Sequence, residues 1–186
     1  MNDNNGANST NRKSFLKYAY EAVNSDLKFA ETKNTFLITL NLAVIGSVFS
    51  FLFKQDVNLN YWARLCLLLF EVLIIIATIV SIVSFFPASE IGKYLSKPKK
   101  EDTIKLMFYQ TIYSRHNDNL ESFQKEIKTY LCDSRPLTPY EEQFSIQILN
   151  LSSVAYTKFD LFTKALILEL ISSIFLISSF ILPFFL

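Results

Sequence analysis

The sequence has little of what enzymes use for chemistry. Among its 186 residues are one histidine, two cysteines and three glycines. A single histidine leaves no multi-histidine metal site, and three scattered glycines leave no glycine-rich phosphate loop. Cys66 and Cys132 allow one disulfide at most and form no CxxC pair. We therefore expect no catalytic residues, no metal site and no enzymatic activity.

Charge is also scarce, and it is nearly absent from three long stretches. With 51% apolar residues and a net charge of +1, the average composition is close to that of a soluble protein. The apolar residues, however, gather in residues 35–53, 65–86 and 165–186, where Glu71 and Glu169 are the only charged side chains. Each stretch is near the ~20 residues that a helix needs to cross the hydrocarbon core. The sequence predicts an all-α integral membrane protein with three transmembrane helices and a small helical cytoplasmic segment. Three core helices of a soluble protein are the alternative, but such long blocks are unusual in a small globular domain.

Lysine and arginine are distributed unevenly around these stretches. Five precede the first, two lie between the first and second, and eleven lie between the second and third. The positive-inside rule then places the N-terminus and residues 87–164 in the cytoplasm. Tyr61 and Trp62 suit the aromatic belt at the outer interface. No cleavable signal peptide is expected at the polar start of the chain.

The division of the chain follows from these spans. We expect a disordered tail over 1–14, a cytoplasmic helix with the first two transmembrane helices over 15–86, a cytoplasmic sensor and stem segment over 87–164, and the third transmembrane helix over 165–186. Residues 87–163 hold ten Lys/Arg against ten Asp/Glu, so no DNA or RNA partner is expected. The basic run at 97–100 fits either contact with anionic lipid headgroups or the ordinary positive charge of an inside loop.

Local patterns predict helices outside the spans. Capping-box spacing at Asp118–Glu121 predicts a helix that ends near Cys132. Thr138, Pro139 and Glu141 form a stronger start signal, and no helix breaker follows until Pro183. One helix is therefore expected from the cytoplasm through the third span. A further helix over 14–33 is predicted from apolar residues at mixed helical spacings, namely Phe15, Tyr18, Ala22, Leu27 and Ala30. For residues 103–114 strand and helix stay open.

The stem of the last helix carries a heptad seam. The seam consists of Phe144, Ile148, Leu151, Ala155 and Phe162. It fits either packing within the chain or contact between copies, and Lys158 on the seam weakens the second reading. As partners we expect membrane lipid and, through this seam, further copies of the chain in a homo-oligomer.

Three polar residues within the spans are candidates for a pore or an interface, because such groups are costly in lipid. They are Asn41, Glu71 and Glu169. From the span boundaries we expect the two glutamates at different depths, and Asn41 at the level of Glu169. Glu169 also fits snorkelling to the inner interface, and Glu71 fits pairing with Arg64.

Aromatic residues beside an arginine suggest a ligand site. Tyr109, Tyr113 and Arg115, with Phe108, are groups that can stack on a base and bind a phosphate. A packed helix face is the alternative reading. His116 is expected in a solvated loop.

Short motifs in this order resemble a known family. Phe29–Lys33, which leads into a span with Asn41 and Gly46, resembles the F-A-D-x-K entry of Pycsar transmembrane effectors, with Glu31 in place of aspartate. The similarity extends over about residues 15–180, and the loop at 135–137 departs from it. Its further elements are Pro87 after the second span, Ile104–Tyr109, Gln147-Ile148 and Lys158-Phe159.

The resemblance implies a role in bacterial antiviral defence. Such an effector resides in the cell inner membrane, responds to cyclic CMP or cyclic UMP made by a partner cyclase, and impairs the membrane so that the infected cell dies, an abortive infection. The nucleotide is an activating ligand and no cofactor is implied. The alternatives are a membrane anchor or adaptor, and an accessory pore protein of another defence system such as RNA-targeting CRISPR.

Overall fold

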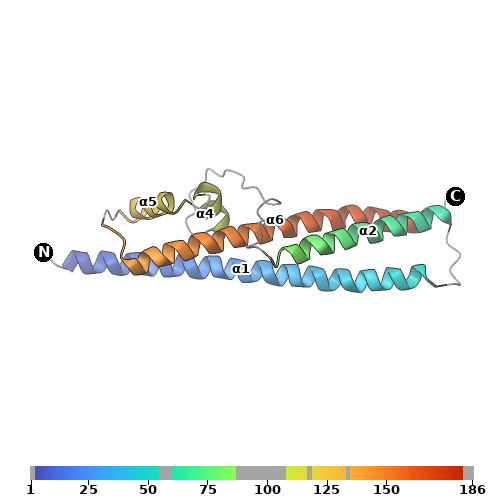
Figure 1. The fold of residues 1–186 in the computed structure, drawn as a ribbon, viewed down its shortest axis with the longest axis horizontal. Helices are drawn as coiled ribbons and strands as arrows, with labels where there is room; N and C mark the ends of the chain where they lie inside the picture. Colours follow the sequence, from blue (N-terminus) through green and yellow to red (C-terminus); the bar gives the residue numbers. More distant parts are fainter. Residues whose placement is uncertain (1–2, 55–59, 87–107, 117–118, 133–134, 182–186) are drawn as a thin grey trace. The chain divides into compact units, whose positions relative to one another are not determined.

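The computed structural model describes residues 3–54, 60–86, 108–116, 119–132 and 135–181, with side chains from residue 11 onward. In these ranges every regular element is a helix, which confirms the all-α prediction (Figure 1). The helices are α1 (Asp3–Leu52), α2 (Tyr61–Val83), α4 (Tyr109–His116), α5 (Leu120–Tyr130) and α6 (Pro139–Ile181). Three of them, α1, α2 and α6, are long and apolar enough to cross a membrane, as predicted.

Contacts divide the chain into two compact units. Unit 1 comprises residues 1–30 and 96–157, and unit 2 comprises residues 31–95 and 158–186. Helices α1 and α6 each pass through both units, so the units cut across the segments expected from the sequence. The reason is that unit 1 combines the first part of α1 with the stem of α6, two stretches that lie far apart along the chain.

Unit 2 is a three-helix bundle. In Figure 1 α1 and α6 run parallel, and α2 runs antiparallel to both. Leu37 of α1, Ala77 of α2 and Ala165 of α6 form one buried cluster, which defines a common level of the three helices. Two alanines at this level let the helix backbones approach closely, as is common in membrane helix packing.

The outside of this bundle is apolar. Large hydrophobic side chains are exposed along all three helices, including Phe36 at 68%, Ile79 at 54% and Leu170 at 63%. Its buried side chains include Asn34, Asn41, Glu71 and Ser81. An apolar exterior around a partly polar interior is the arrangement expected of helices that face lipid.

Unit 1 packs the first part of α1 against the stem of α6, with α4 and α5 beside them. Phe15 contacts Tyr130 at the end of α5, with ring centroids 5.4 Å apart, and Tyr113 of α4 lies 5.0 Å from Tyr156 of α6. The buried stripe of α1 here is Leu16, Ala19 and Val23. The helix predicted over 14–33 is confirmed, since α1 covers all of it. Of the apolar residues that suggested it, Ala30 is buried and Tyr18 is exposed.

The stem seam predicted on α6 packs within the chain. Ile148 and Ala155 are fully buried in unit 1, and Lys158 is buried in unit 2, where it pairs with Glu31. Because residues of this chain already cover the centre of the seam, the structure favours the intramolecular reading of the pattern.

The helix starts follow the local signals closely. Thr138 and Glu141 form the predicted capping box, with the Thr138 N–H donating to Glu141 Oε2 at 2.8 Å and the Glu141 N–H donating to Thr138 Oγ1 at 3.4 Å. From there α6 continues to Ile181 as one helix of 43 residues, which confirms that prediction. For α5, the capping residue is Asn119 and not Asp118, since Asn119 Oδ1 accepts from the Ser122 N–H at 3.0 Å.

Two expectations from the sequence concern segments at the edges of the described residues. Helix α1 begins at Asp3, inside the segment 1–14 where a disordered tail was expected, because a nucleated helix gains one hydrogen bond per added residue. The open segment 103–114 is helical from Tyr109 onward. Pro87, the basic run at 97–100, Ile104–Met107 and Pro183 lie outside the described residues.

Candidate functional site

Polar groups without hydrogen-bond partners lie inside the membrane unit. Asn34 is 1% exposed and Asn41 is 0% exposed, and neither side-chain amide has a partner among the described residues. Both carboxylate oxygens of Glu71, the Ser81 hydroxyl and Glu169 Oε1 are also unpartnered in that part of the chain. These five residues come from α1, α2 and α6, so all three helices contribute to the polar interior.

The cluster of Leu37, Ala77 and Ala165 gives a common reference point from which the position of each polar group along the bundle axis is counted. Asn41 and Glu169 each follow their cluster residue by four positions, or about 6 Å along the axis. On antiparallel α2, Glu71 precedes Ala77 by six positions, or about 9 Å in the same direction. The expectation that Glu71 and Glu169 lie at different depths is therefore wrong, because span boundaries taken from hydropathy do not fix the register between helices.

The neighbours of these carboxylates match only part of what the sequence suggested. Asn41 lies against Glu169, at the level expected for it. Arg64 is exposed near the start of α2 and does not pair with Glu71, whose oxygens have no partner among the described residues. The predicted group of Asn41, Glu71 and Glu169 is thus brought to one level, and the sequence analysis missed Asn34 and Ser81. Their polar character within apolar helical faces was the signal that pointed to them.

A part-buried ion pair lies on the opposite side of the Leu37, Ala77 and Ala165 cluster. Lys158 Nζ is 2.6 Å from Glu31 Oε1, and the Lys158 side chain is only 5% exposed. The same ammonium lies 5.5 Å from the centre of the Phe85 ring. Lys33 lies 5.8 Å and 5.5 Å from the rings of Phe159 and Phe162. The Phe29–Lys33 and Lys158-Phe159 motifs therefore contact each other, which the sequence could not show.

A second buried ion pair holds the start of α6 in unit 1. Arg12 Nε lies 2.8 Å from Glu141 Oε1, and the side chains are 3% and 0% exposed. The Arg12 guanidinium also donates to the carbonyls of Arg135 and Pro136 at 3.3 Å. Burial opposes the charge of Glu141, but hydrogen bonds from Arg12 and Thr138 outweigh it and hold the pKa of Glu141 below its usual value.

The residues predicted to bind a ligand are packed in this structure. Tyr109 and Tyr113 are 8% and 6% exposed, and Arg115 Nη1 lies 2.8 Å from Glu126 Oε1. A nucleotide at this place would have to displace those contacts. The site stays a prediction.

His116 is buried, contrary to the solvated loop expected for it. Its Nδ1 lies 2.9 Å from Ser122 Oγ and its Nε2 lies 3.0 Å from Glu126 Oε2. Burial lowers the pKa of His116, assisted by Arg115 and opposed by Glu126. The packing of α4 against α5 buries the His116 ring. The Phe123 ring contacts it edge-on, with ring centroids 5.2 Å apart.

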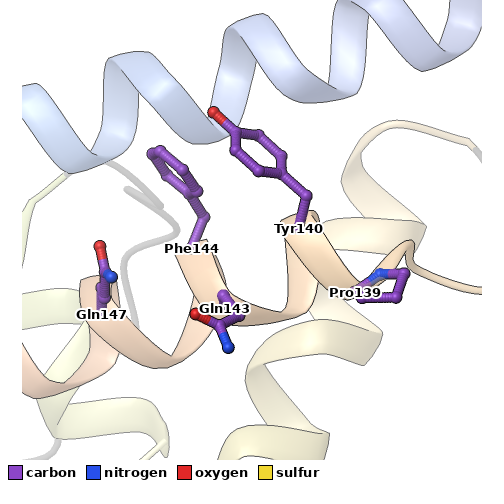
Figure 2. Close-up of a pocket in the computed structure, with 5 residues that line it drawn as sticks. All are labelled: Pro139, Tyr140, Gln143, Phe144 and Gln147. Carbon is purple, nitrogen blue, oxygen red and sulfur yellow. The ribbon is translucent and has the colours of Figure 1, made fainter.

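The stem of α6 presents an open pocket on its surface. The pocket has a volume of about 430 Å³, which is within the range of small-molecule sites. Figure 2 shows the rings of Tyr140 and Phe144 pointing toward α1, Gln143 pointing away from it, and Gln147 further along α6; these four residues and Pro139 line the pocket. The ring centroids of Tyr140 and Phe144 are 4.7 Å apart. The Phe144 ring also contacts Tyr20 of α1 edge-on, with ring centroids 5.6 Å apart. Aromatic rings beside two carboxamides provide stacking and hydrogen bonding for a planar polar ring.

Within the described residues no group of three or more metal-binding side chains occurs, and both cysteines are free. Compared with known proteins, residues 15–185 match the family model described as the Pycsar effector protein domain. No curated protein and no solved structure matches the chain significantly.

Proposed function

Since this chain belongs to the Pycsar effector family, we propose that it is the membrane effector of an antiphage signalling system, activated by cyclic CMP or cyclic UMP from a partner cyclase. Activation impairs the bacterial inner membrane and kills the infected cell. The observation that carries the proposal is the match over residues 15–185, which covers all three apolar helices as well as the polar segments between them.

The helices offer a direct route from a ligand to the membrane. Helices α1 and α6 each run without interruption from residues of unit 1 into residues of unit 2. A rotation or shift of the stem in unit 1 is carried along a stiff helix into the apolar part. A ligand drives such a change only if it binds one state better than the other.

The nucleotide has two candidate positions in unit 1. The pocket with Tyr140, Gln143 and Phe144 is open, and its groups suit a pyrimidine base. Tyr109, Tyr113 and Arg115 offer rings and a cation, but they are buried or paired. We propose the open pocket as the place where the base first docks, and keep the second group as the competing position.

The function is tested in infected cells. Cells that carry the cyclase and this chain are infected with phage, and a potential-sensitive dye reports the membrane potential. We expect depolarisation before lysis, and none in cells with an inactive cyclase. Death of the infected cells with an intact membrane potential would contradict the proposal and favour an adaptor or a CRISPR accessory protein.

Ligand binding is tested with the purified full chain in detergent. Isothermal titration with cyclic CMP, cyclic UMP and, as a control, cyclic AMP should show binding of a pyrimidine nucleotide only. Tyr140→Ala and Gln143→Ala should weaken it, whereas Arg115→Ala should not. The reverse result would move the site to Tyr109, Tyr113 and Arg115, and binding of neither pyrimidine nucleotide would reject direct activation.

A further inference from the structure

The unpartnered groups of the membrane unit form two polar layers. The first layer is Asn34 and Ser81, three positions before Leu37 and four positions after Ala77, which is the same direction on antiparallel helices. The second layer, on the other side of the alanine level, is Asn41, Glu71 and Glu169. The two layers together place four buried polar residues and the half-buried Glu169 in one bundle whose exterior is apolar.

Lipid cannot satisfy these groups. In the described part of the chain the polar side-chain atoms of Asn34, Glu71 and Ser81 have no hydrogen-bond partner, whereas Asn41 lies against Glu169. Buried polar groups in membrane helices are retained where they meet each other or line a water-filled cavity. Water is therefore the partner that the chemistry of the two layers calls for.

The acidic side chains of the second layer determine which ions would enter a water-filled interior. Glu71 and Glu169 place two acidic side chains in this layer, and contact with water favours the negatively charged form of a carboxyl group. Among the described residues of the three apolar stretches there is no lysine or arginine to balance them. A narrow space with low-dielectric walls and one sign of charge concentrates ions of the opposite sign.

We propose that the interior of the membrane unit is a hydrated path that attracts cations, with Asn34 and Ser81 as its first polar layer and Asn41, Glu71 and Glu169 as its second. The inference rests on the proposed function for its purpose, since the membrane damage would then be a flux of cations. The ion pair of Lys158 and Glu31, with Nζ and Oε1 2.6 Å apart, lies about one further turn beyond the first layer and holds α1 and α6 together there.

Cysteine accessibility tests the path without any nucleotide. In a Cys66→Ala, Cys132→Ala background, single cysteines replace Asn41 and Ser81, with Asn34→Cys as a second choice if either variant fails to fold. Phe36→Cys, on the apolar exterior of the bundle, is the control, and exposed Lys54→Cys is the reference. Proteoliposomes are treated with two membrane-impermeant thiol reagents of equal size, one with a trimethylammonium group and one with a sulfonate.

We expect both polar-layer cysteines to react and Phe36→Cys, which faces lipid, to stay unreacted. Relative to Lys54→Cys, the cationic reagent should be favoured by about tenfold or more at Asn41→Cys, since focused fields change local ion concentrations by 10–10³. Adding Glu71→Gln and Glu169→Gln should remove that preference.

Three results would overturn the path. They are no reaction at either layer, equal preference in the presence and absence of the two carboxylates, and reaction of lipid-facing Phe36→Cys as fast as Asn41→Cys. Because labelling needs neither cyclase nor nucleotide, it is read independently of the activation experiments. If the cysteines are labelled as expected but the chain does not bind cyclic pyrimidine nucleotides, the hydrated path is supported and the proposed activating ligand is rejected.

Discussion

The pair of Arg12 and Glu141 joins three features at one point: the first part of α1, the loop before α6 and the capping box of α6. A buried charge that loses its partner is far more costly than the pair is worth, because the remaining charge stays out of water. The two residues therefore act as a single unit in the stability of unit 1.

Arg12→Met should lower the free energy of unfolding of unit 1 by about 3–5 kcal/mol, because Glu141 is left charged and buried. Chemical unfolding of the full chain in detergent, followed by tyrosine fluorescence, measures it. The matched control is Lys17→Met, since the Lys17–Glu21 pair is exposed and 3.9 Å apart, and its loss should change little. Equal effects of the two variants would contradict this role for Arg12.

His116 gives unit 1 a pH dependence. Its folded pKa lies below the ordinary value of 6.5, so the unfolded chain binds more protons. The stability that it contributes is fully present above pH 6.5 and is lost as the pH falls through 6.5 toward the folded pKa. The melting temperature should fall between pH 7.5 and pH 5.5.

The control for this pH dependence is His116→Phe, which keeps an aromatic ring beside Phe123 but cannot be protonated. The variant should show a smaller drop of the melting temperature over the same pH range. An unchanged drop would assign the effect to groups other than His116. Asp26 is not one of them, because burial raises the pKa of that carboxyl and its effect on stability has the opposite sign.

At the scale of elements, the continuity of α6 matters most for the proposed coupling. The start of α6 could be predicted from the sequence, because Thr138 and Glu141 satisfy backbone N–H groups locally and Pro139 at the first helical position has none to satisfy. Its length was readable because no breaker occurs before Pro183. The helix that packs against the buried face of α6 could not be predicted from the sequence, because a heptad pattern fits a helix of the same chain and a helix of another copy equally well.

A kink in α6 should separate ligand binding from membrane damage. Asn150 is exposed, so Asn150→Pro breaks the helix, at a cost of about 3 kcal/mol, without removing a packed side chain. We expect the variant to insert in the membrane and bind nucleotide, but to cause no depolarisation after infection. Asn150→Ala, which keeps the helix, should behave as the parent chain. Full depolarisation by the proline variant would exclude transmission along α6.

At the scale of the whole molecule, the proposed orientation has a direct test. The distribution of lysine and arginine predicts that Lys54 is outside and Cys132 inside. In intact spheroplasts of a Cys66→Ala chain, an impermeant thiol reagent should label Lys54→Cys and leave exposed Cys132 unlabelled until the cells are permeabilised. Labelling of Cys132 in intact spheroplasts would reverse the topology.

The sequence by itself determined that this is a helical membrane protein with three apolar spans, because hydropathy, breakers and capping residues act over a few neighbouring positions. It also carried the family motifs. Only the tertiary structure decided which polar groups meet. Glu31 pairs with Lys158 and Arg12 with Glu141 across more than a hundred residues, and Glu71 reaches the level of Glu169. The reason is that helix register is set by side chains packing between helices, such as Leu37 against Ala77 and Ala165, and no local pattern contains that information.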